Sequence, residues 1–559
     1  MKGCFKRAGA KQLVVVCLAS ILVACGSSSN NELTEPPVTQ PPVVEPPISE
    51  PPVVEPPEVI TVPFDNARAG KVDGVRIWQL PDAPSGSRPD QSWLALGSDS
   101  EGAIYISGHD HHSNSMLYRL FQADQTLRWV GDARSASEAA NNWQDGETAE
   151  KFHTRPTAHQ GRVYVATLDK SSMDTSYLNT RGFHWYGYDN QDQRFIDLSA
   201  TEANGVGAAT MQVVTIQVDT ENDLLYGMSI PENRLLKYDI GKGVTTVLGR
   251  PQQWNGYFYS NRFMWLDSRG RVYISGGSER SQWNRGEDPE IFNHVWYYDP
   301  LSGFGELPAF ALQGANALEV GQWDRTHQRL YTSDDQGNIY VFTDATASWA
   351  YLGRPSFSNA AKTWIFQLSA DEQKIYIGLS DMGAENNALF EYEIATGEST
   401  VLVNIDELDD QAAAENFIAG YDSWDKQGNF YIAAFSMYDG ENVLMLGINP
   451  VRIKVAKGIL PELLEVSAVV EGENIIVSRS GDNSLPLSVL YEVKGLDLNE
   501  SLMFSEFGQF TFPATQSRQM ISLDSLQLPV EEGYTSTVFE LVPDGNSYIS
   551  NHQQVLLNP

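Results

Sequence analysis

The chain has 559 residues, of which 38 are lysine or arginine and 72 are aspartate or glutamate, so its formal net charge is −34. A chain this acidic repels phosphate, which argues against nucleic acid and against an anionic membrane surface as partners. All three cysteines, Cys4, Cys17 and Cys25, fall at the N-terminus. The folded part is therefore expected to contain no disulfide and no thiol chemistry.

The N-terminus has the pattern of a secretion signal. Lys6, Arg7 and Lys11 precede an apolar run over residues 13–24. This run is shorter than the roughly 20 residues of a membrane-spanning helix but has the length of a signal-peptide core. We therefore expect a lipoprotein signal peptide over residues 1–24 rather than a membrane helix.

The end of that run resembles the lipobox of bacterial lipoproteins. It reads Leu-Val-Ala-Cys over residues 22–25 and is followed by Gly26. The resemblance implies that Cys25 carries the lipid and becomes the first residue of the mature chain. Gly26 replaces the aspartate that commonly retains lipoproteins in the inner membrane. This implies a lipid anchor at the outer membrane or cell surface of a Gram-negative bacterium.

A proline-rich segment comes next. Residues 35–58 carry a Pro-Pro pair every five residues, which favours a polyproline II conformation. At about 3.1 Å per residue this segment reaches on the order of 70 Å. It has no apolar periodicity from which a core could form. We interpret residues 25–63 as a stalk between the lipid and the globular part.

One strand pattern recurs between residues 64 and 457. A short turn leads into a strand of β-branched and aromatic residues centred on a tyrosine, at Tyr105, Tyr164, Tyr226, Tyr273, Tyr331, Tyr376 and Tyr431. Spacings of 45 to 62 residues suit four strands with their loops and leave no room for a helical crossover in each unit. The pattern predicts an all-β, seven-bladed β-propeller over residues 64–457, where the sequence shows no convincing helical period, with the tyrosines packed between blades.

The tyrosine pattern stops before residue 458. Residues 458–559 contain short alternating strands separated by turn residues, which predicts a small β-sandwich of immunoglobulin-like size. A structural cap on the propeller and a glycan-binding module are both compatible with this sequence. We favour the cap.

The histidines are concentrated in one part of the chain. Six of the nine lie within residues 109–184, at His109, His111, His112, His153, His159 and His184. Ligands of propellers gather over the central channel on the face where the innermost strand of each blade begins, here called the top face. The repeat places several of these residues on that face, together with a basic residue from the fourth blade: His109, His111, His153, His184 and Arg262.

Two other interpretations of the histidines stay open. The first is a metal site, since imidazole and carboxylate are zinc ligands. However, adjacent His111 and His112 point apart on an extended chain, and no paired spacing typical of zinc is present. The second is that they are ordinary loop residues. We predict no cofactor for the chemistry; a structural Ca²⁺ or Zn²⁺ remains open and is not predicted.

The chain resembles the seven-bladed propeller polysaccharide lyases that degrade ulvan, a sulfated glucuronate and rhamnose polymer, in four stretches: GHDHHSNSMLYRL (108–120), EKFHTRPTAHQGRVYVATLD (150–169), RGFHWYGYD (181–189) and SNRFMWLDSRGRVYISGG (260–277). The resemblance covers the propeller and not the stalk or the C-terminal part. It implies cleavage of a uronate by β-elimination, with histidine and tyrosine transferring protons and arginine neutralising the carboxylate.

This chemistry needs those residue types. A cation must neutralise the uronate carboxylate while charge develops on C5, and Arg262 can do so with two parallel hydrogen bonds. A base of near-neutral pKa must take the C5 proton, and we assign this role to His153. Tyr259 and His184 are the candidates for donating a proton to the departing O4, and which group is acid and which is base stays open. Four further residues are predicted to bind sulfate or uronate groups: His109, His111, Asn114 and Arg155.

A different class of function competes with the lyase. Many lipid-anchored propellers are non-catalytic scaffolds for envelope assembly, and this one could also bind a glycan without cutting it. A scaffold has no reason to gather histidines on one face, so we favour the lyase. A quinone-dependent dehydrogenase is a weaker alternative, because the chain lacks an adjacent cysteine pair and a repeated tryptophan docking motif. We expect a monomer that acts on an acidic sulfated polysaccharide.

Overall fold

The computed structural model describes residues 67–110, 112–169, 179–230, 233–252, 254, 262–275, 294–313, 317–355, 362–380, 388–415, 417–436, 442–497, 502–526, 534–551 and 554–557. The predicted signal peptide and stalk, with Cys25, lie outside the described residues. So do His111 and Tyr259. None of the helices in the described part is long and apolar enough to cross a membrane.

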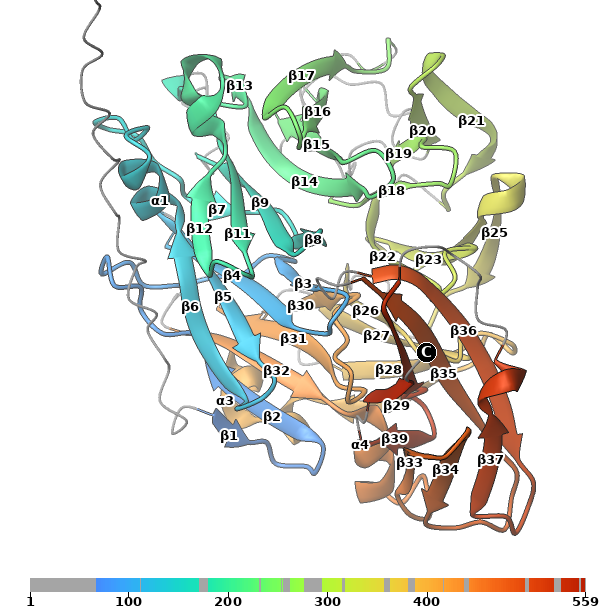
Figure 1. The fold of residues 1–559 in the computed structure, drawn as a ribbon. Coiled ribbons are helices and arrows are strands. Elements are labelled where there is room, and N and C mark those ends of the chain that lie inside the picture. Colours follow the sequence, from blue (N-terminus) through green and yellow to red (C-terminus); the bar gives the residue numbers. More distant parts are fainter. Residues whose placement is uncertain are drawn as a thin grey trace, which may run out of the picture. The chain divides into compact units, whose positions relative to one another are not determined.

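Most of the described chain is β-strand, arranged as antiparallel sheets that follow one another along the chain (Figure 1). In four of these sheets, four strands pair in chain order: β3 (Leu96–Ser98), β4 (Ile104–His109), β5 (Ser115–Phe121) and β6 (Thr126–Asp132); β14 (Gln212–Asp219), β15 (Leu224–Ile230), β16 (Leu235–Asp239) and β17 (Val244–Gly249); β18 (Met264–Leu266), β19 (Val272–Ser275), β20 (His294–Asp299) and β21 (Gly303–Ala311); β22 (Leu318–Trp323), β23 (Arg329–Asp334), β24 (Ile339–Thr343) and β25 (Ser348–Gly353). This repetition is the architecture of a β-propeller, as the sequence predicted.

The sheet that comes between the first and the second of these along the chain has a divided inner strand. Its members are β7 (Lys151–Phe152), β8 (Thr157–His159), β9 (Arg162–Leu168), β11 (Trp185–Asp189) and β12 (Arg194–Asp197). Both β7 and β8 pair with β9. A separate two-stranded ribbon lies beside this stretch of the chain, formed by β10 (Gly182–Phe183) and β13 (Ala208–Ala209).

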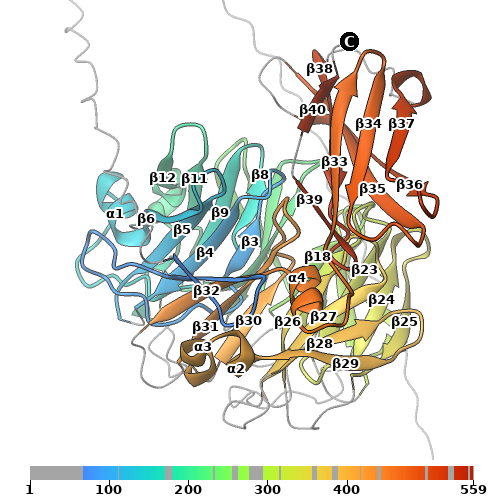
Figure 2. The ribbon, with the colours of Figure 1, turned by 90° about the horizontal axis from the view of Figure 1, so that it is seen from below.

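The remaining propeller strands form one nine-stranded sheet (Figure 2). Its strands are β26 (Lys362–Leu368), β27 (Lys374–Ser380), β28 (Ala388–Glu393), β29 (Ser399–Asn404), β30 (Phe417–Tyr421), β31 (Phe430–Phe435), β32 (Val443–Ile448), β2 (Val75–Gln79) and β1 (Ala67–Ala69). Strands β26 and β30 pair in parallel, and all other neighbours are antiparallel. Strand β2, from the start of the folded chain, pairs with β32 near the end of the propeller. This closure, which the sequence did not predict, pairs an edge of β32 that would otherwise stay open.

The C-terminal residues form two further four-stranded sheets. One contains β37 (Arg518–Ser522), β34 (Asn474–Ser480), β33 (Leu464–Glu471) and β39 (Tyr548–Ser550); the other contains β36 (Leu502–Phe512), β35 (Leu487–Leu496), β38 (Ser536–Val542) and β40 (Gln554–Leu557). Val466 and Val477 of the first sheet and Val489 and Phe539 of the second belong to one buried apolar cluster. The two sheets therefore share a core.

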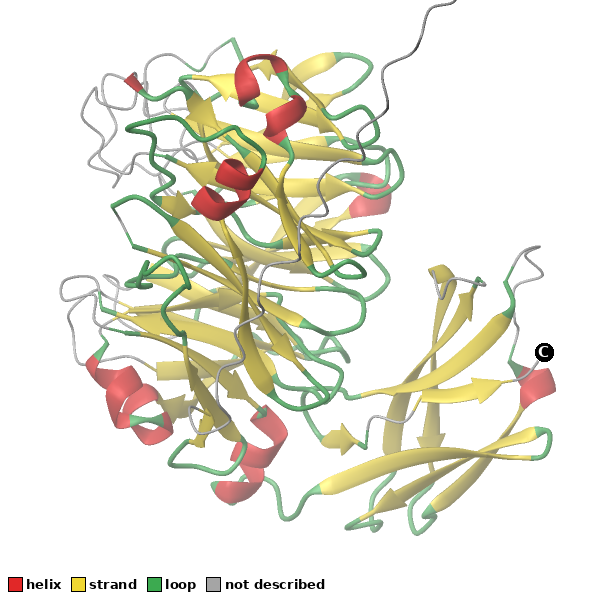
Figure 3. Cartoon of the chain, turned by 60° about the vertical axis from the view of Figure 1, so that its left-hand side comes forward, coloured by secondary structure: helices red, strands yellow, loops and turns green. Residues whose placement is uncertain are grey.

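The helices are few and short (Figure 3). They are α1 (Ala133–Ala139), α2 (Ile405–Leu408), α3 (Asp410–Ala414) and α4 (Pro450–Ala456), with single-turn 3-10 helices η3 (Ser199–Thr201), η4 (Ala203–Gly205), η6 (Asp344–Thr346) and η7 (Leu523–Ser525). Residues 64–457 show no convincing helical period in the sequence, although α1 to α4 all lie within them. Helices this short show no helical period in the sequence, but a capping residue can still start one. The Asp132 carboxylate accepts the Ser135 N–H and begins α1.

The repeated tyrosines occupy the second strand of successive propeller units, and all seven are buried. In three units an aspartate six residues earlier explains the repeat. Its carboxylate accepts backbone N–H groups of the turn and the hydroxyl of the tyrosine, as in Asp99 and Tyr105, Asp267 and Tyr273, and Asp425 and Tyr431. One side chain thus stabilises both the turn and the burial of the phenol.

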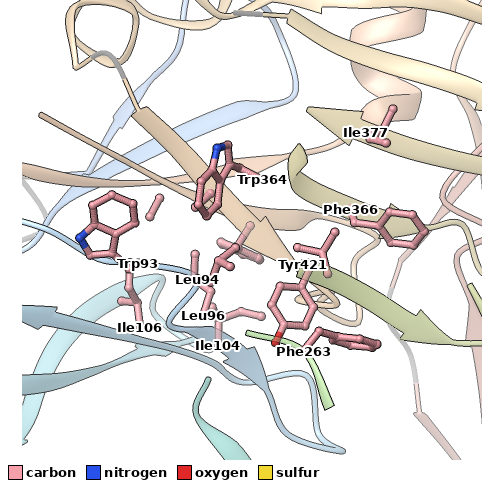
Figure 4. Close-up of a cluster of buried hydrophobic side chains, with 14 of the residues drawn as sticks. Trp93, Leu94, Leu96, Ile104, Ile106, Phe263, Trp364, Phe366, Ile377 and Tyr421 are labelled. Atoms are coloured by element: carbon pink, nitrogen blue, oxygen red, sulfur yellow. The ribbon is translucent and has the colours of Figure 1, made fainter. Parts of the chain in front are cut away.

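Apolar side chains from several units meet at the centre (Figure 4). The rings of Phe263 and Tyr421 lie 6.0 Å apart, and Trp93 lies 5.9 Å from Trp364 and 5.4 Å from Phe435. These contacts join residues from the first, fourth, sixth and last propeller units. They fix the ends of the inner strands on which the predicted site was placed.

The bottom face, where the first strand of each unit turns into the second, contacts the C-terminal sheets. The Ala370 N–H donates to the Asp544 carbonyl at 2.9 Å. The Tyr376 hydroxyl donates to the Gly545 carbonyl at 2.7 Å. The Lys426 ammonium forms an ion pair with Glu540 at 3.3 Å. The C-terminal domain is therefore attached at the end of the propeller opposite the predicted site.

Candidate functional site

Arg262 lies against two adjacent indole rings on the top face. It comes directly before β18, and its Cζ atom is 5.1 Å from the ring centroid of Trp93 and 5.0 Å from that of Trp364. Each such contact contributes about 2 kcal/mol when it is shielded from water. The guanidinium is therefore held in place by residues of two other propeller units.

His153 belongs to the same group of residues. Its imidazole is buried, and Nδ1 lies 3.2 Å from the carbonyl oxygen of Val214 on β14. Because a carbonyl only accepts hydrogen bonds, Nδ1 carries the proton and the basic lone pair of the neutral ring is on Nε2. Burial, followed by the positive charges of Arg262 and Lys151, holds the pKa of His153 well below its usual value. His153 is thus neutral at physiological pH, as a general base must be.

Lys151 is a third basic residue in this group, and the sequence analysis missed it. Its Nζ lies 5.9 Å from the ring centroid of Trp93. Burial and then the charge of Arg262 lower the pKa of Lys151 to about 8, while Glu150 and Asp90 act in the opposite direction. The spacing from His153 was a usable signal, since residues two apart on an extended strand share a face. We refer to Trp93, Lys151, His153, Arg262 and Trp364 as the top cluster.

His184 lies in a different buried group. Its Nδ1 is 2.9 Å from Asp197 Oδ2 and its Nε2 is 3.1 Å from Glu147 Oε1. Burial lowers the pKa of His184, but the hydrogen bonds to Asp197 and Glu147 outweigh it and raise the pKa to about 9. Arg181 also binds Glu147, at 2.9 Å, and Asn142 donates to Asp197 at 2.8 Å. These five residues form the His184 cluster.

The structure therefore brings His153 and Arg262 together but not His184. Among the described residues, no hydrogen bond or ion pair joins the His184 cluster to the top cluster. Both ring N–H groups of a charged His184 already donate to carboxylates, which stabilises the fold and does not favour proton donation to a substrate. No sequence pattern indicated this arrangement, because Glu147 lies in a loop and Asp197 on β12, far from it in the sequence.

The predicted substrate-binding residues that the structure describes lie within the fold and contact other residues there. Asn114 is fully buried, and its amide nitrogen donates to Asp132 Oδ1 at 2.9 Å and to Ser87 Oγ at 3.1 Å. His109 is also fully buried, at the end of β4. Neither position supports direct contact with a polysaccharide.

Arg155 joins three propeller units. Its Nε donates to the Leu96 carbonyl at 3.2 Å, and its guanidinium forms an ion pair with Asp422 at 2.7 Å. Its Cζ lies 5.1 Å from the ring centroid of Tyr421. These contacts fix inner strands to one another, so the described role of Arg155 is structural.

The sequence left open whether the protein binds a structural metal ion. Within the described ranges, no group of three or more histidine, cysteine, aspartate or glutamate side chains is arranged to hold a metal ion.

No protein-family model matches the chain, and no curated protein matches it. Solved structures resemble it only distantly. An oligogalacturonate lyase in complex with manganese is 12% identical with a TM-score of 0.40, over 68% of this chain and 98% of that chain. YCF48 bound to D1 peptide is 10% identical with a TM-score of 0.41, over 68% and 97%. The β-propeller domain of Cps50 (Swd1) from Myceliophteria thermophila is 9% identical with a TM-score of 0.41, over 66% and 98%. Similarity at this level says nothing about what the present protein binds or cleaves.

Proposed function

We propose that this protein is a polysaccharide lyase that cleaves a uronate-containing sulfated polysaccharide, ulvan, by β-elimination at the top cluster. The observation that carries the proposal is the pairing of a neutral His153 with the fixed cation Arg262. A base and a carboxylate-binding cation are the two groups that removal of a proton next to a carboxylate requires. The resemblance of the surrounding sequence to ulvan lyases supports the same reaction.

The proposed reaction uses these residues as follows. Arg262 binds the uronate carboxylate and stabilises the negative charge that develops when the C5 proton leaves. His153 Nε2 takes that proton. The electron pair forms the C4–C5 double bond, the C4–O4 bond breaks, and O4 takes up a proton. Tyr259, which lies outside the described residues, is our candidate for the donor of that proton.

Ultraviolet absorbance tests the reaction directly. Elimination leaves a C4–C5 double bond conjugated with the carboxylate, so incubation of the protein with ulvan should generate an absorbing product. Hydrolysis or binding would produce none. The matched control is the Arg262→Asn variant, which should lose about 10²–10³ in rate because a preorganised charge-stabilising group is removed. No absorbance with ulvan or with any other uronate polymer would overturn the proposal.

A glycan-binding protein without catalysis is the second candidate. One observation favours it: only 4% of the His153 surface is exposed, so its ring offers little access to a substrate proton. Indole rings such as those of Trp93 and Trp364 also pack well against sugars. Retarded migration of the protein in a gel containing ulvan, without any absorbing product, would support this candidate over the lyase.

We also propose the finer architecture. The successive sheets, with β2 closing the last one, correspond to seven blades. The two C-terminal sheets with their shared core correspond to an immunoglobulin-like sandwich that caps the bottom face. In support, Arg325 from the bottom of the propeller lies with its Cζ 5.9 Å from the ring centroid of Phe507. Lys454 of α4 donates to Asn546 Oδ1 at 2.8 Å.

The lipid anchor at Cys25 remains part of the proposal. The Cys25→Ser variant should move from the detergent phase to the aqueous phase in a two-phase separation and should keep its melting temperature. Material that stays in the detergent phase would contradict the lipoprotein assignment without affecting the proposed reaction.

A further inference from the structure

Two cations share one indole ring in the top cluster. Lys151 Nζ and Arg262 Cζ lie 5.9 Å and 5.1 Å from the ring centroid of Trp93. They come from different propeller units, Lys151 from β7 and Arg262 from the segment before β18. The fold therefore brings together positive charges that are far apart in the sequence, within a chain whose net charge is −34.

This arrangement differs from that of the buried lysines. Lys454 Nζ is 2.5 Å from a Glu391 carboxylate oxygen, and Lys494 Nζ is 2.9 Å from Glu540. In the part of the chain that the structure describes, no carboxylate forms an ion pair with Lys151, although the charges of Glu150 and Asp90 act to raise its pKa. An ammonium that is largely removed from water and placed near a second cation is unfavourable unless an anion joins it. Such arrangements occur preferentially at functional sites.

We propose that Lys151 and Arg262 act together as a two-cation site for an oxyanion of the substrate, either a carboxylate or a sulfate ester, with Lys151 as a binding residue. This inference rests on the proposed function in so far as the oxyanion belongs to a polysaccharide. Binding by the pair, however, requires no turnover. The site would hold the polymer in place on the side of His153 from which the proton is taken.

The first experiment uses the unaltered full-length protein. Acylation of Lys151 by an amine-reactive reagent is followed by peptide mapping, in the presence of increasing inorganic sulfate or of increasing glucuronate. Protection of Lys151, with no change at exposed Lys242, is expected. Protection by only one of the two anions identifies the oxyanion as sulfate or carboxylate. Equal acylation of Lys151 at all concentrations of both anions would overturn the inference.

The second experiment measures affinity for ulvan in gels, with His153→Gln as the background so that no product forms. Lys151→Gln should weaken binding about 10–100-fold, as expected for loss of a charged hydrogen bond, and Lys151→Arg should restore most of it. Lys242→Gln removes the same charge from an exposed site and should have no effect. Unchanged binding in a folded Lys151→Gln variant contradicts the inference even if the lyase assay succeeds. Weakened binding supports it even if the lyase assay fails.

Discussion

Two buried histidines in neighbouring parts of one propeller unit have opposite environments. His153 faces a backbone carbonyl and two cations, and its pKa is lowered. His184 is held between two carboxylates, and its pKa is raised to about 9. Both were predicted to be catalytic. The comparison teaches that burial alone does not set the charge of a histidine, because the neighbouring charges decide whether it is a base or part of an ion pair.

The largest expected effect separates the two histidines by activity. His153→Gln should lower lyase turnover by about 10²–10⁴, the usual contribution of a general base. His184→Gln should leave the rate per folded molecule nearly unchanged. The measurement is the initial rate of product absorbance, normalised to the folded fraction. Equal losses in both variants would mean that the two clusters act as one site, although no hydrogen bond or ion pair joins them among the described residues.

The second-largest effect is on stability, and here the His184 variant is the one that loses more. His184→Gln should lower the free energy of unfolding by about 3 kcal/mol, because it leaves the buried Asp197 carboxylate without its cation, whereas Glu147 keeps Arg181. Urea denaturation followed by fluorescence measures this loss. The exposed His112 supplies the control, and His112→Gln should unfold at the same urea concentration as the unaltered protein. A His184→Gln variant of normal stability would show that the ion pair contributes nothing net.

The pH dependence sharpens the comparison further. Because the pKa of His184 is raised in the folded state, its contribution is fully present below pH 6.5 and is lost as the pH rises through about 9. This loss is about 3 kcal/mol at most. His153 has a lowered pKa, so its contribution is present above pH 6.5 and declines as the pH falls, since only the unfolded chain takes up the proton.

Unfolding curves from pH 5 to 9.5 test both signs. The alkaline decline should be absent in His184→Gln, and the acid decline should be smaller in His153→Gln. If His184→Gln retains the alkaline decline, another group is responsible for it.

The smallest effect concerns the bottom face. Tyr376→Phe removes the hydroxyl that donates to the Gly545 carbonyl and accepts from Lys454, and should cost about 1 kcal/mol in unfolding free energy. Binding of ulvan should be unaffected, since this contact lies at the opposite end from the top cluster. A variant with weakened ulvan binding would connect the C-terminal domain to the site.

Local repetition made the fold accessible from the sequence, whereas the site depended on contacts between distant residues. The tyrosines repeat because the same local contact forms in several units: a turn aspartate accepts the hydroxyl of the buried tyrosine, as at Asp99 and Tyr105. The position of His153 on the inner strand of its unit, between β7 and β8, could be predicted from the repeat. The partners of His184 could not, because Glu147 and Asp197 approach it only after folding. The cation and indole contacts of Lys151 were hidden for the same reason.

The pairing of β2 with β32 has a mechanical consequence. The chain reaches β2 through β1, and residues of this leading stretch form ion pairs with the α3 region, Arg68 with Asp409 and Lys71 with Asp410. A force applied to the chain directly before β1 therefore loads these surface ion pairs and the β1–β2 hairpin before it reaches the β2–β32 ladder. Tension can therefore separate β1 from β2 while β2 stays paired with β32.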